Sequence, residues 1–148
     1  MSLVNKEDVV LELEGTTQKE ILHNLALKAY ELNRVDNAET FFEQLCLREK
    51  ETTTGFGNGI AIPHARHKCV KQAGIIIARC QNGIEWNALD GQPVKTCICL
   101  IAPDDKNDFH LAMLSKLARK LIYEDFVDML KNGDIETLLT EVNRVLEN

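Results

Sequence analysis

The chain has 148 residues, a formal net charge of −6 at pH 7 and 45% hydrophobic residues, a composition typical of an ordinary globular protein. This length suffices for one hydrophobic core, so we expect a single domain over residues 1–148. The negative charge argues against non-specific nucleic-acid binding, because the protein would repel the phosphates. The longest apolar run, residues 97–102, is too short to cross a bilayer, and the amino-terminal residues lack the pattern of a secretory signal.

The five cysteines are odd in number and show no C-x-x-C spacing. Cys97 and Cys99 lie two residues apart in an apolar segment, so they share one face of a strand and are expected in the core. The pattern favours free thiols in a reducing cytoplasm over a disulfide framework.

Two helices are expected in the first third of the chain. Residues 17–20 form a capping box, with Thr17 as N-cap and Glu20 at N3. Residues 36–39 begin a second helix that ends near residue 50 and carries Arg48 in its last turn. Arg48 either complements the helix dipole from solvent or brings its guanidinium to a bound anion, and the residue types alone leave both options open.

The central segment alternates three glycines over residues 55–59 and continues with the apolar residues 60–62, Pro63 and His64. This order predicts a tight turn, a short buried strand that Pro63 ends, and an exposed histidine able to act as a nucleophile. The loop is neither a Walker A motif nor G-x-G-x-x-G. Its backbone N–H groups serve a tight turn, an anion site, or both.

The second half of the chain alternates strands with turns and then becomes helical. We expect strands over 74–80, 84–86 and 94–102, separated by turns at 82–83 and 90–91.

Asn107 or Asp108 caps a helix whose inward face carries His110, Leu114, Leu117 and Leu121. Further helices follow over 123–130 and after an Asp134 cap. We therefore predict an α/β fold, a single domain with a central mixed β-sheet flanked by helices on both faces.

The run from Thr54 to His64 resembles a family signature, T-G-x-G-x-G-[IV]-A-[IV]-P-H. It is the active-site motif of the fructose/mannitol-type (type 2) IIA proteins of the bacterial phosphoenolpyruvate-dependent sugar phosphotransferase system. Three further segments resemble the same family in order and spacing: the Arg-Glu pair at 48–49, the G-I-x-W…D-G-x-P-V segment at 83–94, and the H-L-x-x-L-x-x-L-A helix at 110–118.

The resemblance implies a phosphotransferase that works through a phosphohistidine. His64 would accept a phosphoryl group from the carrier HPr and pass it to an acceptor cysteine of a IIB domain, with no metal, nucleotide or other cofactor. His110 would donate to the phosphate and orient it, and Arg48 would support it electrostatically. The protein would be cytoplasmic, would associate with a membrane permease complex without inserting, and would not bind nucleic acid.

The surface around His64 must admit two partner proteins, and Phe56 and Ile62 are its predicted rim. His67 is the weakest candidate for the site, because a histidine in a loop is more often a solvent-exposed residue.

Three other functions remain open on the sequence. A IIA protein of the nitrogen-related branch would signal through its phosphorylation state, although residues 65–67 and 83–94 favour the fructose-like branch. A metal-binding protein would use His64, His67 and His110, but no spacing matches a known zinc pattern. A cysteine hydrolase built on Cys69 and His67 has no supporting signature.

Overall fold

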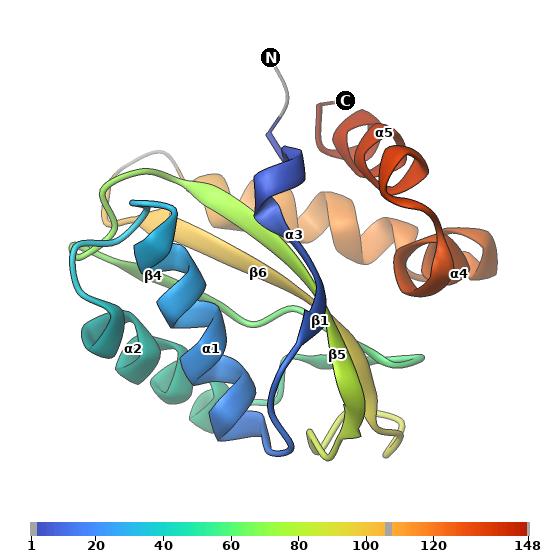
Figure 1. The fold of residues 1–148 in the computed structure, drawn as a ribbon, viewed down its shortest axis with the longest axis horizontal. Helices are drawn as coiled ribbons and strands as arrows, with labels where there is room; N and C mark the ends of the chain where they lie inside the picture. Colours follow the sequence, from blue (N-terminus) through green and yellow to red (C-terminus); the bar gives the residue numbers. More distant parts are fainter. Residues whose placement is uncertain (1–2, 106–107, 148) are drawn as a thin grey trace.

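The computed structural model describes residues 3–105 and 108–147, which form one α/β domain with a central sheet between two groups of helices (Figure 1). The described residues form a short 3-10 helix (Lys6–Asp8) and five α-helices: α1 (Gln18–Glu31), α2 (Ala38–Glu51), α3 (Phe109–Lys120), α4 (Glu124–Asn132) and α5 (Ile135–Glu147). The strands are β1 (Val9–Leu13), β2 (Gly55–Gly57), β3 (Ile60–Ala61), β4 (His64–His67), β5 (Gly74–Ile84) and β6 (Val94–Pro103).

The sheet is mixed, as predicted, and β6 is its central strand. The strand order is β1-β5-β6-β3-β2, and β4 also pairs with β6. β5 runs antiparallel to β6, whereas β3 and β4 run parallel to it in succession along its length. The two short strands on either side of Pro63 therefore share one long partner, and this arrangement fixes the backbone that carries His64.

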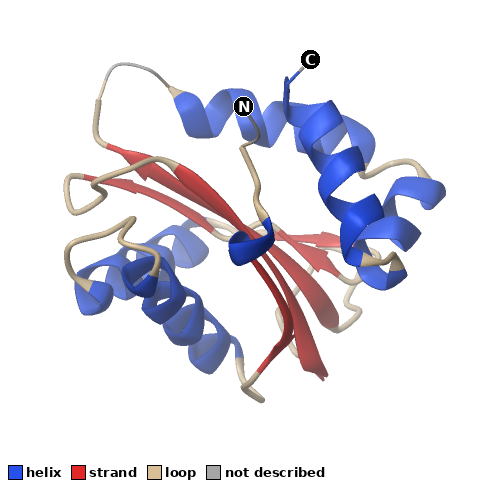
Figure 2. Cartoon of the chain, turned by 45° about the horizontal axis from the view of Figure 1, so that its top comes forward, coloured by secondary structure: helices blue, strands red, loops and turns tan. Residues whose placement is uncertain are grey.

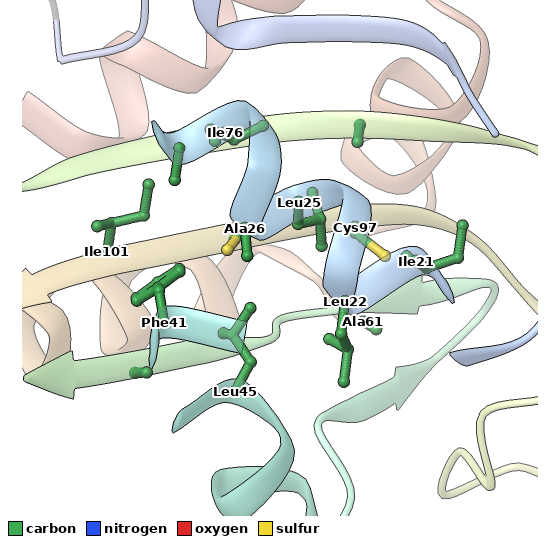
Figure 3. Packing of buried hydrophobic residues seen from close by; sticks show 14 of the residues in the cluster. Ile21, Leu22, Leu25, Ala26, Phe41, Leu45, Ala61, Ile76, Cys97 and Ile101 are labelled. Atoms are coloured by element: carbon green, nitrogen blue, oxygen red, sulfur yellow. The ribbon is translucent and has the colours of Figure 1, made fainter. Parts of the chain in front are cut away.

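Helices cover both faces of the sheet, and the residues of β5 and β6 alternate between two cores (Figure 2). The first core packs α1 and α2 against one face, where Phe41, Leu45 and Cys97 are fully or almost fully buried (Figure 3). The second core packs α3, α4 and α5 against the other face. Ile98, the next residue along β6 after Cys97, belongs to this second core.

Most predicted helix starts are confirmed by hydrogen bonds. The Thr17 side chain accepts from the Glu20 N–H at 3.1 Å, and the Asp134 side chain caps α5 through the Thr137 N–H. The Glu20 carboxylate accepts from the N–H and hydroxyl of Thr16, the residue before the N-cap. Within the described residues, no helix combines the length and apolar character that a membrane crossing requires.

Two predictions about the β5–β6 region are wrong. Residues 82–83 do not form a turn, and 84–86 is not a separate strand, because β5 continues to Ile84. The register against β6 shifts between Arg79 and Ile84, and this irregularity accommodates Asn82 and Gly83 within the strand. The turn that reverses the chain therefore lies later, within residues 85–93.

Candidate functional site

His64 is the first residue of β4, and only 7% of its surface is exposed. The predicted exposure of this histidine is wrong. It does follow a short strand, β3, and Pro63, as predicted, but it begins a further strand instead of lying in a loop. Pro63 separates β3 from β4, but its carbonyl accepts from the Leu100 N–H at 3.0 Å, and pairing with β6 resumes at once, with His64 opposite Leu100. α2 packs against β4. His64 is thus a held, largely desolvated imidazole rather than a loop side chain.

The hydrogen bonds of His64 determine which ring nitrogen carries the proton. Nδ1 lies 2.8 Å from the carbonyl oxygen of Ile62, and a carbonyl only accepts, so Nδ1 is the protonated nitrogen. Nε2 accepts from the Arg48 Nε–H at 3.1 Å. The neutral ring therefore directs an unprotonated Nε2 toward the guanidinium. Nε2, which carries the lone pair, is the nucleophilic atom that the geometry offers.

The surroundings of His64 keep the ring neutral near pH 7. Burial lowers the pKa of His64 most, and the positive charge of Arg48 and the nearby His110 lower it further. The hydrogen bond to the Ile62 carbonyl and the Glu51 carboxylate act in the opposite direction without reversing the shift.

Arg48 reaches the site from the last turn of α2. Its Nη1 donates to the Thr52 carbonyl at 2.7 Å, while its Nε–H meets His64. The same guanidinium therefore meets a carbonyl at the carboxyl end of α2 and also lies beside His64. No carboxylate among the described residues forms an ion pair with this guanidinium, so its charge is available to an incoming anion.

Two cavities meet at His64. One of about 440 Å³ lies between α2, β4 and α3, and one of about 230 Å³ lies on the side of the glycine segment. Both are lined by His64, Arg48 and Leu114. The imidazole therefore borders two hollows of the surface, into which groups from a partner can enter.

His110 lies in the first turn of α3 and lines the larger cavity with His64, as the sequence predicts. The two ring centroids are 6.3 Å apart. Burial and the charge of Arg66 lower the pKa of His110, with Asp108 opposing, so this ring too is neutral near pH 7. Its Nδ1 is buried and has no hydrogen-bond partner among the described residues, which leaves one polar atom of the site unsatisfied.

The start of α3 differs from the predicted cap. Asn107 lies outside the described residues, and Asp108 is the N-cap residue but makes no side-chain cap bond. Its carboxylate instead lies 3.6 Å from Nη1 of Arg66, which also lies 3.6 Å from Asp104 through its Nε. Arg66 therefore ties β4 to both ends of the loop that leads to His110.

Glu49 organises the segment between α2 and the glycines. Its carboxylate accepts from the Thr54 N–H at 3.0 Å and from the Thr54 hydroxyl, which in turn lies 3.4 Å from the indole Nε1 of Trp86. The neighbours Arg48 and Glu49 thus have separate tasks, since the first contacts His64 and the second holds the chain that forms the smaller cavity.

The glycine segment does not present its N–H groups to His64. The Asn58 N–H donates to the carboxylate of Asp90 at 2.9 Å. The anion that this N–H binds is therefore a side chain of the protein and not a ligand. Gly55 is required for a close approach, because a Cβ there would lie 2.7 Å from the Cα of Ala88. Gly57 adopts a φ of +125°, which only glycine adopts readily.

Exposed leucines surround the two cavities. Leu47, Leu89 and Leu111 have exposed fractions of 52%, 76% and 53%. Leu47 and Leu111 line the larger cavity, and Leu89 lines the smaller one. We call these three residues the leucine rim. The predicted rim residues Phe56 and Ile62 also line the smaller cavity, but Ile62 is buried.

The metal-binding and cysteine-hydrolase alternatives receive no support from the geometry. His67 accepts from the Cys69 N–H through its Nδ1, and burial raises the pKa of the Cys69 thiol, the reverse of what a hydrolase nucleophile needs. Within the described residues, no three His, Cys, Asp or Glu side chains are arranged to hold a metal ion. His67 and Cys69 are structural residues of the β4–β5 connection.

The sequence analysis missed several residues that line or shape the site. Gln44, Leu47 and Glu51 recur at helical spacing and form one wall of the larger cavity together with Arg48, which the sequence had indicated. An exposed leucine on that otherwise polar face was the available signal. The ion pairs of Arg66 left no signal in the sequence, because its partners Asp104 and Asp108 lie about 40 residues further along the chain.

Comparisons with known proteins give a consistent result. The model of the family "Phosphoenolpyruvate-dependent sugar phosphotransferase system, EIIA 2" matches residues 2–144. A fructose-like EIIA component of the phosphotransferase system from Escherichia coli K12 is 32% identical over 148 residues, which is all of both chains.

Solved structures agree with the fold. The crystal structure of the nitrogen regulatory protein IIA-Ntr from Neisseria meningitidis has a TM-score of 0.82 and 32% identity, covering 97% of this chain and 96% of that one. The mannitol enzyme IIA in its complex with phosphorylated enzyme IIB from Escherichia coli has a TM-score of 0.78 at 18% identity, covering 97% and 96%. At that identity, the second likeness concerns the fold alone.

Proposed function

The chain belongs to the EIIA 2 family of the phosphoenolpyruvate-dependent sugar phosphotransferase system, and on this premise we propose that it carries a phosphoryl group on Nε2 of His64. The observation that carries the proposal is the Nδ1 bond to the Ile62 carbonyl, which leaves Nε2 unprotonated beside two cavities. Residues 1–148 act as one carrier unit in this proposal.

The chemistry is an in-line displacement at phosphorus. The Nε2 lone pair forms the new N–P bond while the P–N bond of the donor phosphohistidine breaks, and the donor nitrogen keeps the electron pair. Nδ1 keeps its proton, and the Ile62 carbonyl stabilises the positive charge that develops on the His64 ring. Because the transition state is loose, the protein contributes mainly position and charge.

Arg48 and His110 supply that charge and position. The Arg48 Nε–H occupies the Nε2 lone pair in the resting site, so the guanidinium moves aside before attack and then binds phosphoryl oxygens. His110, neutral and with an unsatisfied Nδ1, donates an N–H to another phosphoryl oxygen. A metal ion is not part of this proposal, because the charge is met by these side chains.

HPr is the donor in this proposal, and the acceptor is the cysteine of a IIB domain. The solved mannitol complex, which pairs enzyme IIA with phosphorylated enzyme IIB, supports this direction of transfer within the family. The leucine rim supplies the apolar contact around His64, and its small area suits partners that dissociate quickly. With these two partners, the protein acts in the cytoplasm, next to a permease complex.

The decisive experiment is intact-mass analysis after incubation with phosphoenolpyruvate, enzyme I and HPr. The wild type should gain one acid-labile phosphoryl group, His64→Gln should gain none, and His67→Gln should gain one as the matched histidine control. Phosphorylation of His64→Gln, or an unmodified wild type beside active upstream proteins, would refute the assignment.

We further propose sugar uptake of the fructose-like kind, with regulation of the nitrogen-related kind as the second candidate. The full-length match to the fructose-like component supports the first, and the Neisseria structure, at the same identity, supports the second. Transfer from the phosphorylated protein to the cysteine of a fructose-type IIB domain tests the choice. A protein that accepts from HPr but passes nothing to a IIB domain would be a regulator.

A further inference from the structure

A cavity of about 620 Å³ lies where β5, β6, the glycine turn and the end of α4 meet. It shares no lining residue with either cavity beside His64. Its volume is within the range of small-molecule sites. Nothing in the phosphoryl relay uses it, so its lining needs an explanation of its own.

The charges of this cavity oppose those of the protein. Three cations line it, Arg79, Lys95 and Lys131, against one carboxylate, Asp90, although the chain as a whole carries −6. None of the three cations forms an ion pair with a carboxylate among the described residues. Asp90 is already engaged by the N–H groups of Asn58 and Gln92.

Two of the three cations are held in place without being neutralised. Arg79 donates to the carbonyls of Leu130, Met129 and Gly133 at the end of α4, and burial lowers its pKa. Lys131 donates to the Asn58 carbonyl at 3.1 Å. An entering anion would therefore meet fixed positive charge, which costs little free energy to organise.

The other polar residues of the lining are neutral. Asn58, Gln92, Thr96 and Asn132 carry amide or hydroxyl groups, which hydrogen-bond to uncharged hydroxyls. We propose that this cavity binds a small organic phosphate that also bears hydroxyl groups, with the phosphate at the cations and the hydroxyls at the amides. The site is independent of the His64 relay, and its test requires no phosphoryl transfer.

The binding test is calorimetric titration of the wild type with glucose 6-phosphate, glycerol 3-phosphate, inorganic phosphate and glucose. We expect saturable binding of at least one phosphate ester, weaker binding of inorganic phosphate and none of glucose. No saturable binding of either ester would overturn the proposal. Equal affinity for inorganic phosphate and the esters would overturn the assignment of the hydroxyl-binding groups.

Variants locate the site. Lys95 is exposed, and its amine has no hydrogen-bond or ion-pair partner among the described residues. Lys95→Gln should therefore leave the fold unchanged and weaken ester binding by about tenfold, the size expected for one charge-assisted bond. Lys95→Arg should retain binding. The control is Lys120→Gln, which removes a cation from a separate cationic hollow on α3 and α5. An equal loss in Lys95→Gln and Lys120→Gln would mean non-specific attraction and would refute the site.

Discussion

Arg48 donates its Nε–H to Nε2 of His64 at 3.1 Å, so the atom with the free lone pair is covered by a cation rather than by solvent. One side chain thereby lowers the pKa of the histidine and protects its nucleophilic nitrogen until a phosphoryl group arrives. The Nη1 bond to the Thr52 carbonyl limits how far the guanidinium can withdraw. In the proposed reaction, the guanidinium therefore first gives up its hydrogen bond to Nε2 and then binds phosphoryl oxygens instead.

Replacing Arg48 should change both the titration of His64 and the rate of phosphoryl transfer. Arg48→Gln removes a positive charge that lowers the pKa of His64, so NMR titration of the ring should give a higher pKa than in the wild type. Loss of the donor should slow phosphoryl acceptance from HPr by about 10²-fold. Lys50→Gln, in the same last helical turn, is the control and should change neither quantity appreciably.

His110→Ala should slow transfer by about 10²-fold without abolishing phosphorylation, because it removes one proposed donor and leaves the nucleophile in place. Single-turnover transfer from phosphorylated HPr measures the rate, and intact mass measures the extent. His110→Gln, which keeps an N–H donor, should recover part of the rate. Wild-type rates in His110→Ala, in both directions of transfer, would show that the assigned role is wrong.

Stability should fall as the pH drops through the titration of His64. Its native pKa lies below the unfolded value of about 6.5, so the unfolded chain binds the proton first. The stabilisation is therefore complete above that unfolded value and is lost as the pH falls toward the native pKa. Urea unfolding between pH 7.5 and 5 should show this loss, and His64→Gln should reduce it. An identical slope in both proteins would mean that His64 does not contribute.

Glu49→Gln should destabilise the protein by about 1–3 kcal/mol, because a charged acceptor for the N–H and hydroxyl of Thr54 is lost. Urea unfolding at pH 7 measures the change. The control is Glu51→Gln in the same helix, where an exposed carboxylate is replaced and the change should stay within about 0.5 kcal/mol. Equal effects of the two substitutions would contradict the role given to Glu49.

Leu111→Asp should raise the apparent KM for HPr by about tenfold, because it places a charge in the leucine rim. The matched control is Ile122→Asp, which charges a residue that is 71% exposed and lines neither cavity beside His64. An HPr titration of the phosphorylation rate distinguishes the two variants. If Ile122→Asp were as defective as Leu111→Asp, the leucine rim would not be the contact surface.

The sequence alone determined the features that depend on local patterns. Capping side chains and apolar spacing determined where α1, α2 and α5 begin, and the alternation along β6 placed Cys97 in the core. The motif around His64 pointed to the correct family, because the order and spacing of its residues can be read directly from the sequence.

Tertiary structure alone decided the features that depend on distant partners. β4 pairs with β6 directly after Pro63, and His64 is buried there. The hydrogen bond to the Ile62 carbonyl keeps the proton on Nδ1 and leaves Nε2 unprotonated. The position of Arg48 depends on α2 packing against β4, so its contact with His64 is visible only in the folded chain. Sequence spacing reports which residues share an element, but the protonation and exposure of a side chain depend on the elements that pack around it.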